Sequence, residues 1–518
     1  MASPQKKLAE SLEALRALQD RGAVAMRSGD LTRTHRERLV KNGFLQKVMK
    51  GWYIAASPDA ARGESTSWYA SFWAFCAAYL QERFGTNWSL SPEQSLLLHV
   101  GNMTVPSQLL VRSPKARNKI TRLPHNTSLF ETRADLPEAG QVAEKEGLRL
   151  FSVPAGLVSC GPGFFRQHAT DARVALNMMR HSSDVLSLLL KGGRTTVAGR
   201  LAGAFRNIGR DRIASDIVKT MRIADFDIRE SDPFEDRIDL IMPAREQSPY
   251  VNRIRLMWQR MRKKIPGQFP AAPGRPSDID AYLKAADDIY VTDAYHSLSI
   301  EGYRISPELI ERVCSGEWNP DGYDDDREHK NALVARGYWQ AYQGVRESLH
   351  KVLEGDNPGA VCDENHGDWY REMFGPSVTA GLLRTADLAG YRNDQVYIRR
   401  SMHVPPRYEA VRDCMPAFFD LLREEPEPEV CVVLGHFVFV FIHPYMDGNG
   451  RMGRFLMNVM LAAGGFPWTV IPLEKRDDYM AALESASVRQ DIAPFAMFLG
   501  RLVSDNLEGK QAPRAPIL

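Results

Sequence analysis

Cysteine is scarce in this chain, with six residues among 518. None of them stands in a CxxC pair or at a short repeated spacing, so we expect free thiols rather than disulfides or a zinc site. Long apolar runs are also lacking, because the longest, residues 430–442, is interrupted by Gly435 and His436 and is too short to span a bilayer. Residues 1–7 have no apolar signal-peptide core. These absences predict a cytoplasmic protein with no membrane-spanning segment.

A large excess of charge of either sign is missing as well. Lys and Arg number 66 and Asp and Glu 64, which gives a formal net charge of +2. This balance excludes a histone-like or ribosomal protein and an acidic disordered chain. The average conceals one basic segment, because residues 1–50 hold eleven Lys or Arg and five Asp or Glu, a net charge of +6. The rest of the chain is therefore slightly acidic.

The basic segment has a pattern typical of a winged helix-turn-helix. Leucines recur at helical spacing over residues 8–18, and we expect further helices at 23–27 and 32–41 and a β-hairpin at 44–54. We therefore predict a winged helix-turn-helix over residues 1–57. Its helix 32–41 would enter a DNA major groove, with Arg33, His35, Arg36 and Arg38 near bases or phosphates. The alternatives are a small helical domain with a solvated basic face and a protein-interaction module.

The remaining chain is predicted to contain a mixed α/β regulatory domain, a linker and a helical domain. Over residues 58–264, aromatic residues indicate a core, and short strands at 109–111 and 148–151 accompany a helix at 184–191. A winged helix before such a domain resembles the regulatory region of abortive-infection antitoxins. Residues 265–277 are rich in Pro and Gly and predict a linker, and residues 278–507 predict an all-helical domain. The expected fold class is mainly α.

The strongest chemical signal is the sequence HPYMDGNGRMGR at residues 443–454. A nearly all-apolar helix is expected to deliver His443 at its C-terminal end, where Pro444 stops it. Imidazole titrates near neutrality, so His443 can take a proton from an incoming hydroxyl. Asp447 offers a hard oxygen ligand that suits Mg²⁺.

The middle of this motif predicts an anion site. Gly448, Asn449 and Gly450 form a turn that leads into a helix, so backbone N–H groups and the helix dipole favour negative charge at one point. Arg451 and Arg454 are three residues apart on that helix and can bracket a phosphate chain. An ordinary helix–loop–helix would account for the GNG turn alone but not for eight specified positions together. The motif therefore predicts a phosphoryl- or nucleotidyl-transfer site.

At these residues the chain resembles the Fic (filamentation induced by cAMP) family, whose motif reads HPFxxGNGRxxR. The one departure is Tyr445 in place of Phe. The resemblance implies transfer of AMP from ATP to a Ser, Thr or Tyr hydroxyl of a target protein or of the chain itself. It also implies that His443 is the general base and that Asp447 holds Mg²⁺. The phosphates would then lie on Gly448, Asn449, Gly450, Arg451 and Arg454.

A second segment resembles the inhibitory motif of the same family. Ser297, Glu301 and Gly302 fit its pattern Ser/Thr-xxx-Glu-Gly/Asn and precede the catalytic motif in the chain. The resemblance implies the N-terminal-inhibited class, in which this glutamate pairs with the second motif arginine, here Arg454. One carboxylate then neutralises the arginine that should hold the γ-phosphate of ATP.

The resemblance covers residues 278–507 and implies further features. A β-hairpin at 395–404 would dock an extended segment of the target protein. A homodimer is expected from the family, whereas no membrane partner is expected. Three readings of the function stay open: an autoinhibited AMP transferase, a de-AMPylase or transferase of another nucleotide, and a DNA-binding regulator that uses residues 278–507 as a nucleotide sensor.

Overall fold

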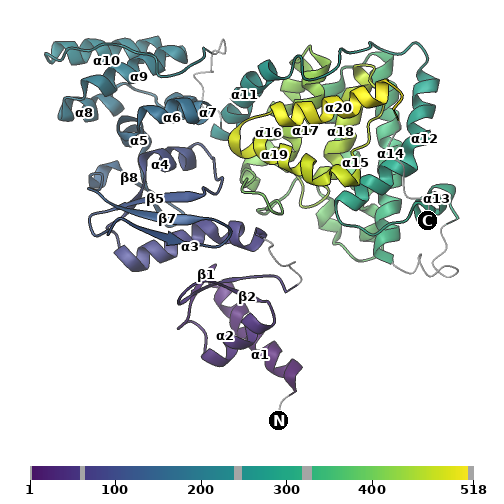
Figure 1. Cartoon of the computed structure of the whole chain (residues 1–518), viewed down its shortest axis with the longest axis horizontal. Coiled ribbons are helices and arrows are strands. Elements are labelled where there is room, and N and C mark those ends of the chain that lie inside the picture. The colour runs from purple at the N-terminus through teal and green to yellow at the C-terminus, as the bar shows by residue number, and fades with distance from the viewer. Residues whose placement is uncertain (1–2, 59–64, 238–247, 318–328, 511–518) are drawn as a thin grey trace. The chain divides into compact units, whose positions relative to one another are not determined.

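The computed structural model describes residues 3–58, 65–237, 248–317 and 329–510 (Figure 1). The fold is mainly α, and the chain divides into two compact units. Unit 1 comprises Met1–Pro249 together with Tyr397–Val404, and unit 2 comprises Tyr250–Val396 and Pro405–Leu518. Within the described ranges, none of the helices combines the length and the hydropathy that a bilayer crossing requires.

Unit 1 begins with two helices and a small antiparallel sheet. Its elements are α1 (Pro4–Gln19), β1 (Ala25–Arg27), α2 (Arg33–Lys41), β2 (Leu45–Met49) and β3 (Trp52–Ala55), with the strand order β1-β3-β2. The helix predicted for residues 23–27 is wrong, because this segment is β1 and pairs Met26 with Tyr53 of β3. Burial of Met26 against the neighbouring strand outweighs the weak helical tendency of so short a segment. The winged-helix assignment of residues 1–57 stays a prediction.

Helix α2 uses part of its basic surface for contacts within the chain. Arg38 Nη1 donates to Ser11 Oγ of α1 at 2.7 Å, and the His35 ring lies 2.9 Å from the same hydroxyl. Arg33 pairs with Glu37 at 2.7 Å. Two of the four residues predicted to face DNA therefore hold α2 to α1, and a third is paired along its own helix.

The rest of unit 1 is a mixed α/β region, as predicted. Its four-stranded sheet has the order β4-β5-β7-β6, formed by β4 (Ser89–Leu90), β5 (Gln108–Ser113), β6 (Lys119–Arg122) and β7 (Ser128–Arg133), and β5 and β7 are parallel. A short ladder joins β8 (Val142–Lys145) to β9 (Leu148–Phe151). Trp68 and Phe72 of α3 (Thr66–Phe84) pack in one cluster with Leu109 and Leu129 of the sheet. The remaining helices are α4 (Pro92–His99), α5 (Val153–Ser159), α6 (Pro162–Gln167), α7 (Ala169–Asn177), α8 (Ser183–Gly192), α9 (Thr195–Asn207) and α10 (Asp211–Ile223).

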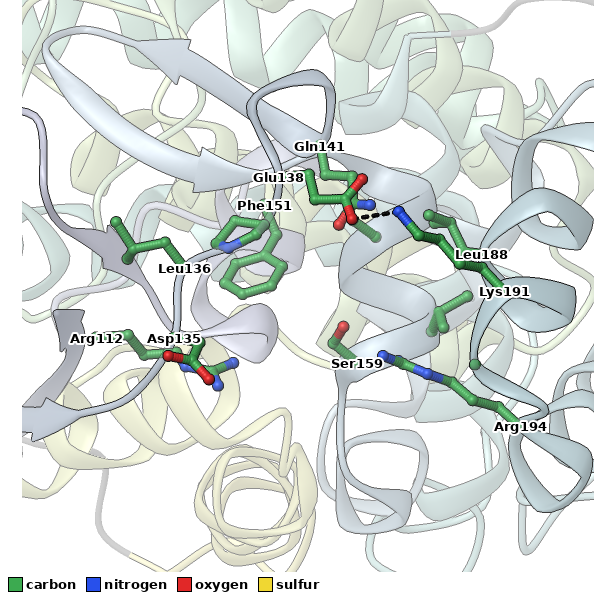
Figure 2. A pocket seen from close by; sticks show the side chains of 14 residues that line it. Arg112, Asp135, Leu136, Glu138, Gln141, Phe151, Ser159, Leu188, Lys191 and Arg194 are labelled. Atoms are coloured by element: carbon green, nitrogen blue, oxygen red, sulfur yellow. Dashed lines mark hydrogen bonds and ion pairs between the residues drawn. The ribbon is translucent and has the colours of Figure 1, made fainter. Parts of the chain in front are cut away.

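Unit 1 contains a cavity of about 360 Å³ (Figure 2). Lys191 of α8 pairs with Glu138 at this cavity, and the Arg112 guanidinium lies 5.5 Å from the centre of the Phe151 ring. None of the lining residues belongs to the site predicted from the sequence. Its lining carries both signs of charge, with Arg112, Lys191 and Arg194 beside Asp135 and Glu138.

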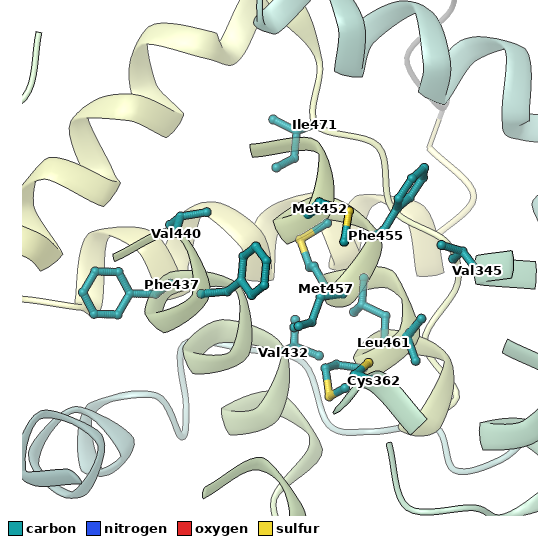
Figure 3. Packing of buried hydrophobic residues seen from close by; sticks show 14 of the residues in the cluster. Val345, Cys362, Val432, Phe437, Val440, Met452, Phe455, Met457, Leu461 and Ile471 are labelled. Carbon is teal, nitrogen blue, oxygen red and sulfur yellow. The ribbon is translucent and has the colours of Figure 1, made fainter. Parts of the chain in front are cut away.

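Unit 2 is helical, and α17 (Pro428–Ile442) and α18 (Asn449–Ala463) lie at its centre (Figure 1). Every residue of α17 from Val430 to Ile442 is buried, because all of its faces contact other helices. Figure 3 shows Val432 and Phe437 of α17 in the same cluster as Met457 and Leu461 of α18. The surrounding helices are α12 (Ile279–Ile300), α13 (Pro307–Ser315), α14 (His329–Glu354), α15 (Pro358–Thr379), α16 (Tyr408–Glu424), α19 (Arg476–Arg489) and α20 (Ala493–Leu507).

Helix α11 (Pro249–Met261) contributes to the core of unit 2. Met257 and Trp258 are buried in the same cluster as the central helices, and Trp258 Nε1 donates to Glu425 at 2.9 Å. Residues 265–278 contain neither helix nor strand, in line with their Pro and Gly content. Unit 2 thus starts earlier than the predicted helical domain, while the boundaries at 57/58 and 264/265 stay predictions.

Residues 395–404 do not form the predicted β-hairpin. A tight turn is present, in which Ser401 N–H donates to the Ile398 carbonyl at 3.1 Å and Arg400 has a positive φ of 61°. No strand is assigned on either side of this turn. Pro405 has no N–H group to donate to a ladder, and its carbonyl instead accepts from the Gln395 side chain at 3.1 Å.

Candidate active site

Helix α17 presents His443 at its C-terminal end, as the sequence predicts. His443 itself has a left-handed backbone, with a φ of 54°, and so ends the helix. Its Nδ1 lies 3.1 Å from the Val440 carbonyl, which can only accept, so Nδ1 carries the proton and Nε2 is the basic nitrogen. Burial lowers the pKa of His443 to about 4. The imidazole is therefore neutral at physiological pH, the form that a general base requires.

Asn449 fixes the loop between α17 and α18. Its side-chain oxygen accepts from Tyr445 N–H and its side-chain amide donates to the Tyr445 carbonyl, both at 2.9 Å. The Tyr445 ring stacks on Tyr370 of α15, with the ring centres 3.9 Å apart. Gly448 supplies the positive φ of 80° that turns the chain into α18. Tyr445 thus keeps the packing role of an aromatic residue, and Asn449 acts on the loop through both groups of its amide.

Two buried arginines belong to the first turns of α18. Arg451 is 1% exposed, and its guanidinium lies 5.0 Å from the ring centre of Phe374 and 5.4 Å from that of Tyr303. Arg454 is also buried. Within the described part of the chain, Arg451 Nε and Nη2 and Arg454 Nη1 have no hydrogen-bond acceptor. Buried guanidinium donors without acceptors are costly, so these atoms suit an anionic ligand such as a phosphate chain.

The end of α12 brings Glu301 and Ser297 to Arg454. Arg454 Nη2 donates to Glu301 Oε1 at 2.8 Å and to the Ser297 carbonyl at 2.9 Å, and Arg454 Nε donates to Ser297 Oγ at 2.7 Å. Burial opposes the charge on Glu301, but the positive charge of Arg454 outweighs it and lowers the pKa of Glu301. A Cβ atom added to Gly450 would lie 2.3 Å from Glu301 Oε1. The Glu301 carboxylate therefore lies directly against the glycine turn of the anion site.

The chain reverses direction immediately after Glu301. Gly302 has a positive φ of 92° and donates its N–H to the Ser299 carbonyl at 2.9 Å. From the start of α19, Arg476 Nε donates to the Ile300 carbonyl at 2.9 Å. The predicted inhibitory residues Ser297, Glu301 and Gly302 are thus held in place next to Arg454. Their inhibitory role stays a prediction.

Asp447 fits a metal that is bound together with phosphates. Its side chain is 68% exposed and lies beside the anion site, with Oδ2 3.6 Å from Arg451 Nη2. Among the described residues, no group of three or more His, Cys, Asp or Glu could hold a metal ion. Mg²⁺ commonly uses one or two carboxylates and completes its shell with substrate phosphates and water, so a single exposed carboxylate suits it.

Sequence reasoning missed three residues that contact this site. Phe374 and Tyr303 flank Arg451, and Arg392 donates to the His443 carbonyl at 2.8 Å. Phe374 and Tyr303 lie on α15 and just after α12, so nothing in their local sequence relates them to α18. Arg392 stands in an irregular loop, where periodicity gives no signal.

Residues 366–461 match the Fic/DOC family. A curated relative named protein adenylyltransferase Fic from Nematostella vectensis is 28% identical over 260 residues, which cover 49% of this chain and 57% of the relative. One of the same name from Drosophila willistoni is 29% identical over 232 residues, covering 44% and 43%. The chain therefore spans about half the length of the curated relatives it matches. The predicted resemblance to the Fic family is confirmed.

Solved structures give a weaker likeness. Fic-1 (residues 134–508) from C. elegans is 17% identical with a TM-score of 0.37, covering 66% of this chain and 96% of that one. A Fic domain containing signaling protein from Bacteroides thetaiotaomicron is 16% identical with a TM-score of 0.34, covering 51% of this chain and 100% of that one.

Proposed function

We propose that this Fic-domain chain is a protein adenylyltransferase that moves AMP from ATP to a Ser, Thr or Tyr hydroxyl. The observation that carries the proposal is that a neutral His443 precedes, by one short turn, buried guanidinium donors of Arg451 and Arg454 that have no hydrogen-bond acceptor among the described residues. A base beside an anion site is what the attack of a hydroxyl on a nucleoside triphosphate requires.

In the proposed reaction the target hydroxyl attacks the α-phosphorus of ATP in line with the bond that breaks. A new O–P bond forms, the bond from the α-phosphorus to the bridging oxygen breaks, and pyrophosphate leaves with that electron pair. His443 Nε2 takes the hydroxyl proton, because Nδ1 already donates to the Val440 carbonyl. Arg451, Arg454 and the N–H groups at the start of α18 hold the phosphates. Mg²⁺ on Asp447 would neutralise phosphate charge as pyrophosphate departs.

Glu301 is proposed to keep this activity low. Its carboxylate already pairs with Arg454 at 2.8 Å and lies against Gly450, so the arginine is not free for a γ-phosphate. Removing the carboxylate returns Arg454 to the substrate.

The decisive experiment measures label transfer from α-labelled ATP by the Glu301→Gly protein and by a Glu301→Gly, His443→Ala double variant. We expect Glu301→Gly to raise transfer about tenfold or more and His443→Ala to lower it by about a hundredfold or more. His350→Ala is the matched control, because this exposed histidine of α14 pairs with Glu354 rather than with the site. Equal transfer by wild type and Glu301→Gly would contradict the inhibitory role.

The transferred group and the direction of the reaction are separate questions. The same residues could bind UTP in place of ATP or hydrolyse AMP from a modified protein, with Glu301 positioning the attacking water. Intact-mass measurement of the Glu301→Gly protein after incubation with each nucleotide distinguishes the transferases, because AMP and UMP add different masses. Release of AMP from a premodified target by the wild-type protein would support the reverse reaction.

A DNA-binding regulator is the second candidate function. Residues 1–50 carry a net charge of +6, and Lys47 and Lys50 of the β2–β3 hairpin are exposed. A mobility-shift assay with the Lys47→Glu, Lys50→Glu double variant at low and raised salt tests this function, since phosphate contacts weaken with salt. Target docking on residues 395–404, homodimer formation and a cytoplasmic location stay predictions.

A further inference from the structure

Arg392 of unit 2 is a buried arginine whose guanidinium binds backbone carbonyls. Its side chain is 1% exposed. Nε donates to the His443 carbonyl at 2.8 Å, Nη1 donates to the Asp394 carbonyl at 3.0 Å, and Nη2 donates to the Pro406 carbonyl. Carbonyl oxygens satisfy the donors without cancelling the charge, so burial lowers the pKa of Arg392 to about 10. Removing this side chain would leave three backbone carbonyls without the donors that they have in the folded chain.

Two of the groups that Arg392 binds belong to the catalytic turn. Arg392 Nε binds the His443 carbonyl, and Arg392 backbone N–H donates to the next carbonyl, that of Pro444, at 2.9 Å. His443 has a positive φ of 54°, a conformation that residues with a Cβ rarely adopt. Such a conformation persists where neighbouring groups fix it. Arg392 is a neighbour that fixes both carbonyls of this turn.

The other two groups are the ends of the segment that is expected to dock a target protein. Asp394 lies just before residues 395–404, and Pro406 lies just after them. The planar guanidinium holds its donors in a rigid fork, so the acceptors of its three nitrogens keep fixed positions relative to one another. A single side chain therefore connects the position of the base to both ends of the docking segment.

We propose that Arg392 is a positioning residue, which fixes the His443 turn and the ends of segment 394–406 in one arrangement so that the base meets the hydroxyl of a docked protein. This inference rests on the proposed transfer reaction and adds to it the group that aligns base and target. The Arg392 guanidinium donates to the carbonyls of His443, Asp394 and Pro406, all outside the glycine turn of the anion site, so it should govern the rate of transfer and not the affinity for ATP.

The test compares Arg392→Met and Arg392→Lys in the Glu301→Gly background. We expect Arg392→Met to lower kcat about a hundredfold, because a small displacement of a base has effects of that size, while KM for ATP changes by less than about twofold. Arg392→Lys keeps the positive charge and one or two donors and should recover part of the rate. Guanidinium ion added to an Arg392→Ala variant should also restore transfer.

Arg173→Met is the matched control for loss of a buried arginine. Arg173 of α7 is fully buried in unit 1 and donates to Asn207 Oδ1 at 3.1 Å and to Asp236. A general loss of stability would lower the melting temperature in both methionine variants, and only Arg392→Met should lower kcat. Similar kcat losses in both, scaling with the melting temperature, would overturn the positioning role.

A measurement that needs no activity separates this inference from the proposed function. NMR of labelled histidine reports the pKa of His443, to which Arg392, Glu301, Asp447 and the Val440 carbonyl contribute. Loss of the Arg392 charge should raise that pKa, because a nearby cation disfavours imidazolium. If the Glu301→Gly parent transfers no nucleotide, the proposed function fails; an unchanged His443 signal in Arg392→Met would then also overturn the positioning role.

Discussion

At the scale of single residues, His443 shows how position sets chemistry. An imidazole in water has a pKa of about 6.5 and would be partly protonated in a mildly acidic medium. In this chain the end of a buried helix removes water from the ring, and burial lowers the pKa of His443 to about 4. Arg392 lowers it further, whereas Glu301 and Asp447 raise it. His443 should therefore stay neutral, and able to act as the proposed base, well below neutral pH.

This environment predicts the acidic limb of the pH profile. Transfer by the Glu301→Gly protein should stay nearly constant from pH 8 down to pH 5.5 and fall only as the pH approaches the value of about 4. The sign follows from the neutral form being the base: activity is lost where the folded protein takes up the proton. Near-ultraviolet circular dichroism at each pH shows whether the fold persists. A half-maximal rate near pH 6.5 would contradict the prediction.

The residues of the site differ in how far the sequence could predict them. His443, Asp447 and the glycine turn are adjacent in the chain, so their meeting follows from one helix ending and another beginning. The contact of Glu301 with Arg454 joins residues 153 positions apart, and only the resemblance to a family indicated it. Arg392 was not predicted, because its acceptors are carbonyls whose positions depend on the folded loop.

At the scale of elements, the central helices were predicted well from the apolar pattern and from the Pro and Gly residues that mark helix ends. The apolar run at 430–442, expected to be the helix that delivers His443, is α17 (Pro428–Ile442), and the helix expected after the glycine turn is α18 (Asn449–Ala463). Helix α15 (Pro358–Thr379) begins in residues 358–368, a stretch too polar to show an apolar face from which the start of the helix could be predicted. The errors at 23–27 and 395–404 concern short segments whose partners are distant in sequence, and local pattern cannot determine such pairing.

The close approach of α14 and α15 is an element-scale property that can be tested. A Cβ atom on Gly337 of α14 would lie 2.0 Å from the Met373 carbonyl of α15. Gly337→Ala should therefore lower the free energy of unfolding by about 1–3 kcal/mol, since the helices must separate. It should also weaken ATP binding, because α15 places Phe374 against Arg451. Urea unfolding and calorimetric titration with ATP measure the two effects.

Gly367 of α15 provides the matched control. It is also helical, but an added Cβ would meet only the flexible Arg371 guanidinium, at 3.4 Å. Gly367→Ala should stabilise the protein by up to about 1 kcal/mol, because alanine loses less backbone entropy in a helix. Equal effects of the two substitutions would show that helix propensity, and not the approach of α14 to α15, determines the result.

At the scale of the whole molecule, the two units do not correspond to two uninterrupted stretches of chain. The chain leaves unit 2 after Val396, contributes Tyr397–Val404 to unit 1 and returns at Pro405. Within unit 1, Val105 N–H donates to the Met402 carbonyl at 3.0 Å, and Val404 is 7% exposed in the same cluster as Trp68 and Phe72. The segment expected to dock a target is thus part of the core of the other unit.

Because Tyr397–Val404 packs in the core of unit 1, a single charge buried in this segment should detach it. Val404→Asp should release Tyr397–Val404 from unit 1, because an ionised carboxylate loses its hydration in an apolar cluster. Deuterium exchange should then accelerate in peptides covering 397–404 and Val105, while the β5–β7 ladder keeps its protection. Val404→Ile retains the apolar contact and should leave exchange unchanged. If exchange accelerates throughout unit 1, the substitution unfolds the unit as a whole; if it accelerates nowhere, the segment is held by contacts other than Val404.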